Sequence, residues 1–279
     1  MSGSPTDFPD TPRSTDERQA PQAANLTDPP HPGGEPDRGE PAGPGSPDWG
    51  DRLHQFASTP PSRRRAELHR TGNALRAIVH RLHGSDAPAS ELAAVADELE
   101  DLARRLEAFP SGSLYEGFSE ATLAGQDPHA FFDHSPMLGR ANPLAPPLNL
   151  EKDGTVMRAT AVFGDAYEGP PGCVHGGYVA AAFDEVLGSA QSLGGRPGMT
   201  GRLTVHYRSP TPLRTELRFA GWVDRVEGRK TFTLGTLYAG DRLCAEAEGL
   251  FIAIDVRRYM ELRRERDERF GTPSAPADS

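Results

Sequence analysis

A short stretch in the second half of the chain combines a histidine, two adjacent glycines and an aspartate at a spacing that suits chemistry at a carbonyl group. His175, Gly176 and Gly177 end a turn, and a helix of small residues is expected to follow at once. The first N–H groups of a helix have no internal acceptor and favour negative charge, and glycine lets a ligand approach them closely. Asp184 would lie on this apolar helix, where a carboxylate is costly unless it has a function. Oxyanion donors with a base within reach indicate acyl transfer or hydrolysis.

The elements that would position these residues begin near residue 154. A strand is expected at 155–163, followed by the helix at 176–192. Alternating apolar residues and intervening turn signals predict four further strands, at 202–208, 217–223, 232–238 and 243–254. One helix followed by a four-stranded antiparallel meander is an α+β layout in which the helix packs on the sheet.

The first half of the chain has a different character. Residues 1–50 hold eleven of the 27 prolines and little that would form a core, so we expect a disordered Pro-rich tail. Residues 62–84 and 88–108 each carry a leucine-rich stripe at helical spacing. The first helix is basic and the second acidic, which favours an antiparallel helical hairpin at 62–108. A basic contact with nucleic acid or acidic lipid through Arg63–Arg65 is the alternative, and the neighbouring acidic helix would offset that charge.

Two further segments flank the predicted strands. Residues 110–153 are expected to be rich in loops, and residues 257–270 to form a short charged helix.

Composition limits the classes of function. The formal net charge is −10, which argues against general binding of nucleic acid. Two cysteines, Cys173 and Cys244, do not make a disulfide framework. No apolar run approaches the ~20 residues of a membrane span, and the first residues lack the pattern of a secretory signal. We therefore expect a cytoplasmic protein.

The residues from 115 to 255 resemble the hotdog-fold acyl-CoA thioesterases, in particular the PaaI-type branch and the thioesterase superfamily member four type. The motifs that carry this resemblance are Glu168-Gly-Pro-Pro-Gly-Cys-Val-His-Gly-Gly177, Asp184-Glu185, Met199-Thr200, Tyr207-Arg208-Ser-Pro-Thr-Pro212 and Val226-Glu-Gly-Arg-Lys230. The resemblance implies an antiparallel sheet wrapped around one long helix. It also implies a homo-oligomer, a dimer or tetramer with active sites at the subunit interface, an acyl-CoA substrate, and neither a metal nor an organic cofactor.

The resemblance also implies roles for single residues. Asp184 would activate water or attack the thioester carbonyl itself, and the Gly176 N–H would hold the carbonyl oxygen. Thr200 would orient the water, and His175 would brace the turn or polarise the thioester. Some relatives carry an asparagine six residues before the histidine, where this chain has Gly169, so polarisation would rest more on backbone groups.

Other residues are expected to contact the substrate. They are Gly177, Arg208, Arg229 and Lys230. The basic residues would meet the phosphates of coenzyme A, or else only solvate their loops.

Alternatives accompany several of these assignments. Glu185 points about 100° away from Asp184 around the helix and is expected to be a structural partner rather than a second catalyst. Cys173 lies two residues before His175, which invites a Cys–His nucleophile, but the resembling family uses no thiol there. At the level of the whole domain, the alternatives are a non-catalytic acyl-CoA-binding or sensing protein and a hotdog hydratase, whose Asp/His signature is not found.

Overall fold

The computed structural model of the chain describes residues 61–109, 133–193, 198–253, 261 and 264–265. Its helices are α2 (Arg63–His83), α3 (Ala89–Glu107) and α6 (Gly176–Ser192), with a short 3-10 helix η1 (Asp165–Tyr167). Its strands are β1 (Asn149–Asp153), β2 (Val156–Val162), β3 (Gly198–Tyr207), β4 (Glu216–Glu227), β5 (Lys230–Ala239) and β6 (Arg242–Ala253).

Some predictions concern residues outside the described ranges. The Pro-rich tail at 1–50 and the start of the thioesterase-like region at 115–132 lie outside the described residues. Of the charged helix expected at 257–270, only residues 261, 264 and 265 are described, and these are helical.

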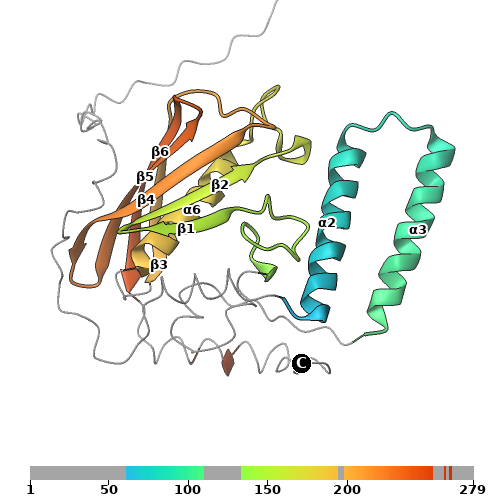
Figure 1. Cartoon of the computed structure of the whole chain (residues 1–279), viewed down its shortest axis with the longest axis horizontal. Helices are drawn as coiled ribbons and strands as arrows, with labels where there is room; N and C mark the ends of the chain where they lie inside the picture. Colours follow the sequence, from blue (N-terminus) through green and yellow to red (C-terminus); the bar gives the residue numbers. More distant parts are fainter. Residues whose placement is uncertain (1–60, 110–132, 194–197, 254–260, 262–263, 266–279) are drawn as a thin grey trace, which may run out of the picture.

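The six strands form one antiparallel sheet that curves around α6 (Figure 1). The strand order is β1-β2-β4-β5-β6-β3, so β1 and β3 are the two edges. Helix α6 contacts β2, β3, β4, β5 and β6. A sheet wrapped around one long helix is the α+β hotdog fold, and this expectation is confirmed.

The expected four-stranded meander is wrong in one respect, because β3 does not pair with β4. It pairs with β6, from Gly198↔Ala253 to Tyr207↔Ala245, while β4 pairs with β2. The connection from β3 to β4 contains Pro210 and Pro212, which suit a longer connection rather than a continuous ladder. This connection passes beside the turn that precedes α6, where the Val174 N–H donates to the Thr211 carbonyl. Only β4, β5 and β6 therefore form a meander.

Strand β1 lies in the segment for which the sequence predicts loops. Its residues, Asn-Leu-Glu-Lys-Asp, include a single apolar side chain, so they lack the alternation that marks a half-buried strand. The strand forms because it pairs with β2 along its whole length, across a turn at Gly154. Gly154 has a φ of 60°, in the left-handed region that glycine adopts without strain.

Close approach between α6 and the sheet depends on glycines in β4 and β5. A Cβ atom at Gly235 would lie 2.9 Å from Leu187 Cδ2, and one at Gly221 would lie 3.0 Å from Val186 Cγ1. Val186 and Leu187 are fully buried. The helix that carries Asp184 is therefore packed directly against the strand backbones, which limits its movement.

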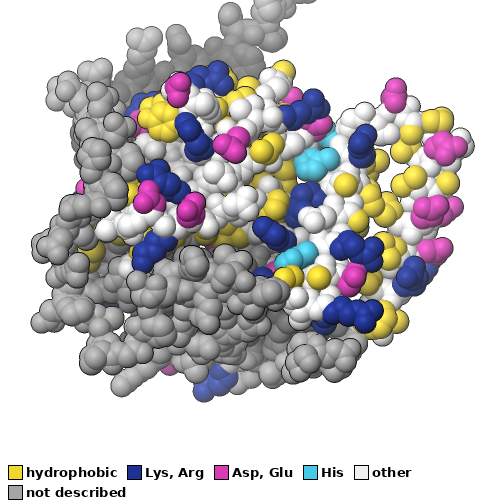
Figure 2. Space-filling model, viewed as in Figure 1, with side chains coloured by type: hydrophobic (Ala, Val, Ile, Leu, Met, Phe, Trp, Pro, Cys, Tyr) yellow, Lys and Arg dark blue, Asp and Glu magenta, His cyan; other side chains and the backbone are white. Residues whose placement is uncertain are grey.

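The two helices expected before the domain are present, and Ser62 caps α2 by accepting the Arg65 N–H at 3.2 Å. Helix α3 runs back in the opposite direction after a short connection (Figure 1). Much of the apolar stripe of each helix stays exposed, and Figure 2 shows hydrophobic side chains along both. The most exposed are Ile78, Val79, Leu82, Leu92, Val95 and Leu106, at 36–55%. The described part of the chain contains no helix that is both long and apolar enough to cross a membrane.

Candidate active site

His175 caps the N-terminus of α6 and holds the turn before it. Its Nδ1 accepts the Gly177 N–H at 3.0 Å, and its own backbone N–H donates to the Tyr167 carbonyl at 2.8 Å. Because Nδ1 is an acceptor, the neutral ring carries its proton on Nε2. The exposed imidazole can therefore brace the turn and still present an N–H outward.

The glycines after His175 have different hydrogen-bonding states. The Gly177 N–H is already used by His175, whereas the Gly176 N–H has no acceptor among the described residues. The Gly176 carbonyl accepts the Tyr207 hydroxyl at 2.7 Å, and a Cβ atom at Gly176 would lie 3.2 Å from that hydroxyl oxygen. The half-buried Gly176 is thus a candidate oxyanion donor, and Tyr207 fixes the peptide that follows it, between Gly176 and Gly177.

Tyr207 has no assigned role in the sequence, although it lies within a motif that supports the resemblance. It is 31 residues from Gly176 along the chain. Spacing along a sequence cannot reveal such a contact, which forms only because the end of β3 lies beside the start of α6.

A hydrogen bond joins Asp184 and Thr200, and their expected catalytic roles stay predictions. The Thr200 hydroxyl donates to Asp184 Oδ1 at 2.7 Å. Asp184 is partly buried on α6, and Thr200 is exposed near the start of β3. The register of β3 against β6 shifts between Thr200 and Arg202, so an irregularity of the strand lies directly beside the pair. Among the described residues, no hydrogen bond is made to the second carboxylate oxygen of Asp184.

The Asp184 carboxylate does not reach the Gly176 donor within one chain. The two residues are eight positions apart on α6, which is a rise of about 12 Å along the helix. Oxyanion donors act at about 3 Å from the developing charge. The candidate site therefore has two halves in one chain, a donor half at the start of α6 and an acid half at its middle, which do not meet on one carbonyl.

Glu185 turns away from the acid half toward the segment before β1. Its Oε2 accepts the Ser135 hydroxyl at 3.5 Å, and the hydroxyl oxygen itself accepts the N–H groups of Met137 and Leu138. Burial, together with the nearby Asp184 charge, raises the pKa of Glu185 to about 7. These contacts agree with the structural role expected for Glu185.

The turn before His175 leaves no room for a side chain at position 169, which explains why glycine occupies it. A Cβ atom there would lie 2.7 Å from His175 Cα, and the Gly169 N–H donates to the Cys173 carbonyl. An asparagine would need the turn to open. In this chain the turn is instead closed by Glu168, whose Oε1 accepts the Gly172 N–H at 2.6 Å.

The three basic residues expected at the substrate lie at two ends of the sheet. Arg208 follows β3 near the donor half, and its Nε donates to Oε2 of the buried Glu246 at 2.6 Å. Arg229 and Lys230 lie at the β4–β5 turn, and Lys230 pairs with Ile252, which pairs with Met199 beside Thr200. They therefore lie at the same end of the sheet as the acid half. Their contacts with substrate stay predictions.

Cys173 does not form a nucleophilic pair with His175. The His175 Nδ1 is occupied by the Gly177 N–H, and Cys173 is partly buried in the strand-like bridge to Pro212. Within the described ranges, no group of three or more His, Cys, Asp or Glu side chains is arranged to hold a metal ion.

The chain is similar to known thioesterases over this region. A profile of the Thioesterase superfamily matches residues 171–246, which include both halves of the site. A relative named acyl-coenzyme A thioesterase THEM4, from Xenopus laevis, is 38% identical over 93 residues, 33% of this chain and 42% of that protein. Its namesake from Bos taurus is 34% identical over 108 residues, 37% of this chain and 44% of that protein. This chain thus spans less than half the length of these curated relatives.

A solved structure extends the similarity beyond the matched segment. The crystal structure of a thioesterase superfamily protein superposes with a TM-score of 0.60 and is 35% identical. The match covers 70% of this chain and 97% of that one. The chain therefore belongs to the thioesterase superfamily.

Proposed function

We propose that this protein is an acyl-CoA thioesterase, which hydrolyses R–CO–S–CoA to a carboxylic acid and coenzyme A. The observation that carries the proposal is the hydrogen bond from Thr200 to Asp184 at 2.7 Å, on the helix that begins with Gly176, whose N–H has no acceptor among the described residues. The similarity to relatives named acyl-coenzyme A thioesterase supports acyl-CoA as the substrate class.

The complete site is proposed to need two copies of the chain. Strand β3 is a free edge of the sheet among the described strands, and an edge strand can pair with a second copy. Antiparallel pairing of β3 about a two-fold axis would place the Thr200 end of one strand beside the Tyr207 end of the other. Asp184 and Thr200 of one subunit would then face Gly176 and His175 of the partner subunit, which closes the gap of about 12 Å.

The hydrolysis can be written with these protein groups alone. Asp184 takes a proton from water as the water oxygen attacks the thioester carbon, and Thr200 holds the carboxylate in place. The Gly176 N–H and the His175 Nε2–H stabilise the oxyanion. The C–S bond then breaks, and the thiolate of coenzyme A takes the proton from Asp184. Direct attack by Asp184 would instead break the C–S bond, release the coenzyme A thiolate and form an acyl-enzyme anhydride. Water attack on the Asp184 carbonyl of this anhydride would leave ¹⁸O from labelled water in Asp184 after a single turnover, which the general-base route cannot do.

Arg229 and Lys230 are proposed to contact the phosphates of coenzyme A, because they lie at the same end of the sheet as Thr200. Arg208 is a weaker candidate, since its guanidinium already pairs with Glu246. The cytoplasmic location belongs to the proposal as well, and fractionation of cells would test it.

The proposal is tested by incubating the purified protein with a panel of acyl-CoA thioesters and a thiol reagent. Wild-type protein should release coenzyme A, and Asp184→Asn should lose this activity while keeping its melting temperature. Asp97→Asn, the same change on the exposed surface of α3, is the matched control. Tight binding of an acyl-CoA without turnover would instead identify a non-catalytic acyl-CoA-binding protein.

A further inference from the structure

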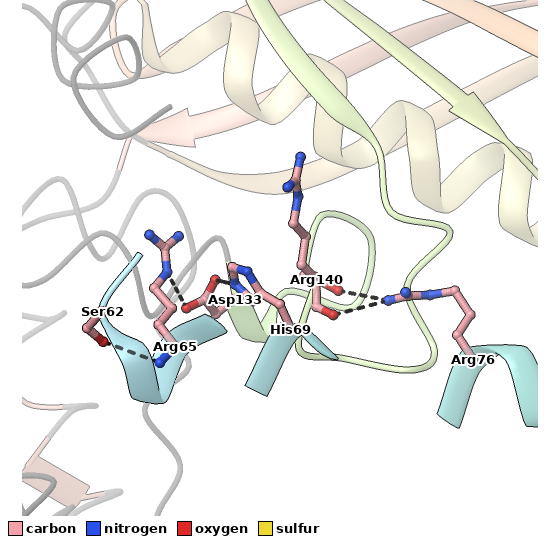
Figure 3. A network of polar contacts seen from close by, with 7 residues as sticks. Ser62, Arg65, His69, Arg76, Asp133 and Arg140 are labelled. Carbon is pink, nitrogen blue, oxygen red and sulfur yellow. Dashed lines mark hydrogen bonds and ion pairs between the residues drawn. The ribbon is translucent and has the colours of Figure 1, made fainter. Parts of the chain in front are cut away.

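Helix α2 is fixed to the thioesterase domain through polar contacts. Asp133 is 5% exposed and accepts Arg65 Nε at 2.7 Å, and its other oxygen lies 2.5 Å from His69 Nε2 (Figure 3). At Gly72 the helix touches backbone directly, because a Cβ atom there would lie 2.5 Å from the Arg140 carbonyl oxygen. The first half of α2 is therefore held by buried contacts that do not involve its exposed apolar stripe.

Arg76 extends this attachment to the middle of the helix. Its Nε donates to the Ala145 carbonyl and its Nη2 to the Asn142 carbonyl, each at 2.8 Å. A longer contact to the Arg140 carbonyl is drawn in Figure 3. These bonds attach α2 independently of His80, which lies one turn further along the helix.

One turn further on, His80 contacts η1. Its Nδ1 accepts the Ala166 N–H at 3.3 Å, and its ring lies edge-on to Tyr167 with the centroids 5.4 Å apart. Gly164 makes room for this ring, because a Cβ atom there would lie 2.7 Å from His80 Cε1. His80 thus fixes both the backbone and the aromatic ring of η1.

Tyr167 in turn holds the donor half of the candidate site. Its carbonyl accepts the His175 N–H at 2.8 Å, and its ring packs edge-on against Tyr178 with the centroids 4.8 Å apart. It is 3% exposed. Tyr167 therefore contacts both the turn before Gly176 and the first turn of α6.

We propose that His80 is a positioning residue for the thioesterase site: through Ala166 and Tyr167 it sets the orientation of the His175–Gly176 turn, and hence of the oxyanion donor. The inference rests on the proposed function for its catalytic consequence. It assigns α2 to the catalytic unit, although α2 precedes the matched segment by nearly ninety residues.

The charge state of His80 suits this role. Burial lowers the pKa of His80 below its usual value, and so do the positive charges of Arg76 and His83, while Asp165 opposes them. At neutral pH the imidazole is therefore uncharged, and Nδ1 is free to accept the Ala166 N–H.

Variants at His80 separate positioning from simple support of the fold. His80→Ala removes both contacts, His80→Asn keeps an acceptor near the position of Nδ1, and Arg81→Ala is the control on an exposed neighbour. We expect His80→Ala to lower kcat by about tenfold with KM changed by less than about twofold, because a displaced donor weakens transition-state binding. Its melting temperature should stay near that of Arg81→Ala, since Arg65 and Arg76 still hold α2. His80→Asn should recover part of the lost kcat.

Hydrogen exchange gives a reading that does not depend on activity. Amides of residues 166–178 should exchange faster in His80→Ala than in Arg81→Ala, with no change elsewhere in α6. Gly164→Ala should have the same effect by pushing on the His80 ring, and should add nothing in the His80→Ala background.

Two results would overturn the inference. One is a kcat and an exchange rate in His80→Ala that match those of Arg81→Ala. The other is a loss of kcat that follows only global unfolding. If the wild-type protein hydrolyses no acyl-CoA, the proposed function fails, and the exchange of residues 166–178 still decides whether His80 positions the turn.

Discussion

At the scale of single residues, the hydrogen bond from Thr200 distinguishes the two oxygens of Asp184. Oδ1 accepts the hydroxyl, so under the proposed function Oδ2 would meet the water or the thioester. We expect Thr200→Val to lower kcat by about tenfold, because orientation is a supporting role. Asp184→Asn should cost about 10²–10⁴-fold, the usual contribution of a general base.

Thr200→Ser is the matched control, because it keeps the hydroxyl and removes only the methyl group. Steady-state kinetics on one acyl-CoA, measured for all three variants, give the comparison. A kcat for Thr200→Val equal to that of the wild-type protein would show that Thr200 serves only as a residue of strand β3.

Glu185 should make stability depend on pH. Its folded pKa of about 7 lies above the usual 4.5, so the unfolded chain loses this proton first as the pH rises. The stabilisation from protonated Glu185 is complete below about pH 4.5 and is lost as the pH rises toward and through 7. Glu185→Gln cannot ionise, and its melting temperature relative to the wild-type protein should therefore increase from pH 5 to pH 8.

Thermal unfolding across this pH range checks the prediction, with Glu98→Gln on the exposed face of α3 as the control. A melting-temperature difference between Glu185→Gln and wild type that stays constant with pH would show that Glu185 does not titrate in this window.

At the scale of elements, local signals are sufficient for some helices and strands and not for others. Helix α6 spans the residues predicted for it, because the His-Gly-Gly turn marks its start and a small-residue apolar pattern continues after it. Strand β1 has no apolar alternation, and it exists only because β2 lies beside it. The position of β3 at the edge next to β6 is a tertiary property that periodicity does not contain.

The same distinction applies to the candidate site. Asp184, Thr200 and Gly176 could be proposed from the sequence because they lie in the motifs that carry the family resemblance, and their catalytic roles stay predictions. The contacts of Tyr207 with Gly176 and of His80 with η1 join residues 31 and 86 positions apart. The distance between the two halves of the candidate site follows from the helical rise, so it can be calculated only once both residues are assigned to the same helix.

The attachment of α2 gives a prediction at this scale. Arg76→Ala should destabilise the protein by about 1–3 kcal/mol, because its guanidinium bonds to several backbone carbonyls that would lose a charged donor. Arg70→Ala is the control, since Arg70 pairs with Glu67 on the exposed surface, and its loss should cost less than about 1 kcal/mol. Urea unfolding measures both changes. Equal midpoints for the two variants would contradict a structural attachment of α2.

At the scale of the whole molecule, the two halves of the candidate site lie eight positions apart on one helix, a rise of about 12 Å. A two-fold assembly would give each site one half from each subunit. Light scattering should then report an even multiple of the chain mass of 30.1 kDa. Dilution that separates the subunits should abolish activity, because neither subunit alone contains a joined site.

Mixed oligomers of two inactive variants test most directly whether each active site combines the acid half of one subunit with the donor half of the other. Asp184→Asn removes the acid half. Gly176→Pro removes the donor N–H at the first helical position, where proline is tolerated, and the extended ψ of 132° at His175 suits a following proline. Gly176→Ala, which keeps the N–H, separates loss of the donor from steric effects near Tyr207.

The two variants are co-expressed with different affinity tags, and mixed pairs are isolated by sequential purification. Each mixed pair should contain one site with both halves intact and one with neither, so coenzyme A release should return to about half of the wild-type rate while each parent stays inactive. Mixed pairs that are no more active than their parents would contradict a site shared between subunits.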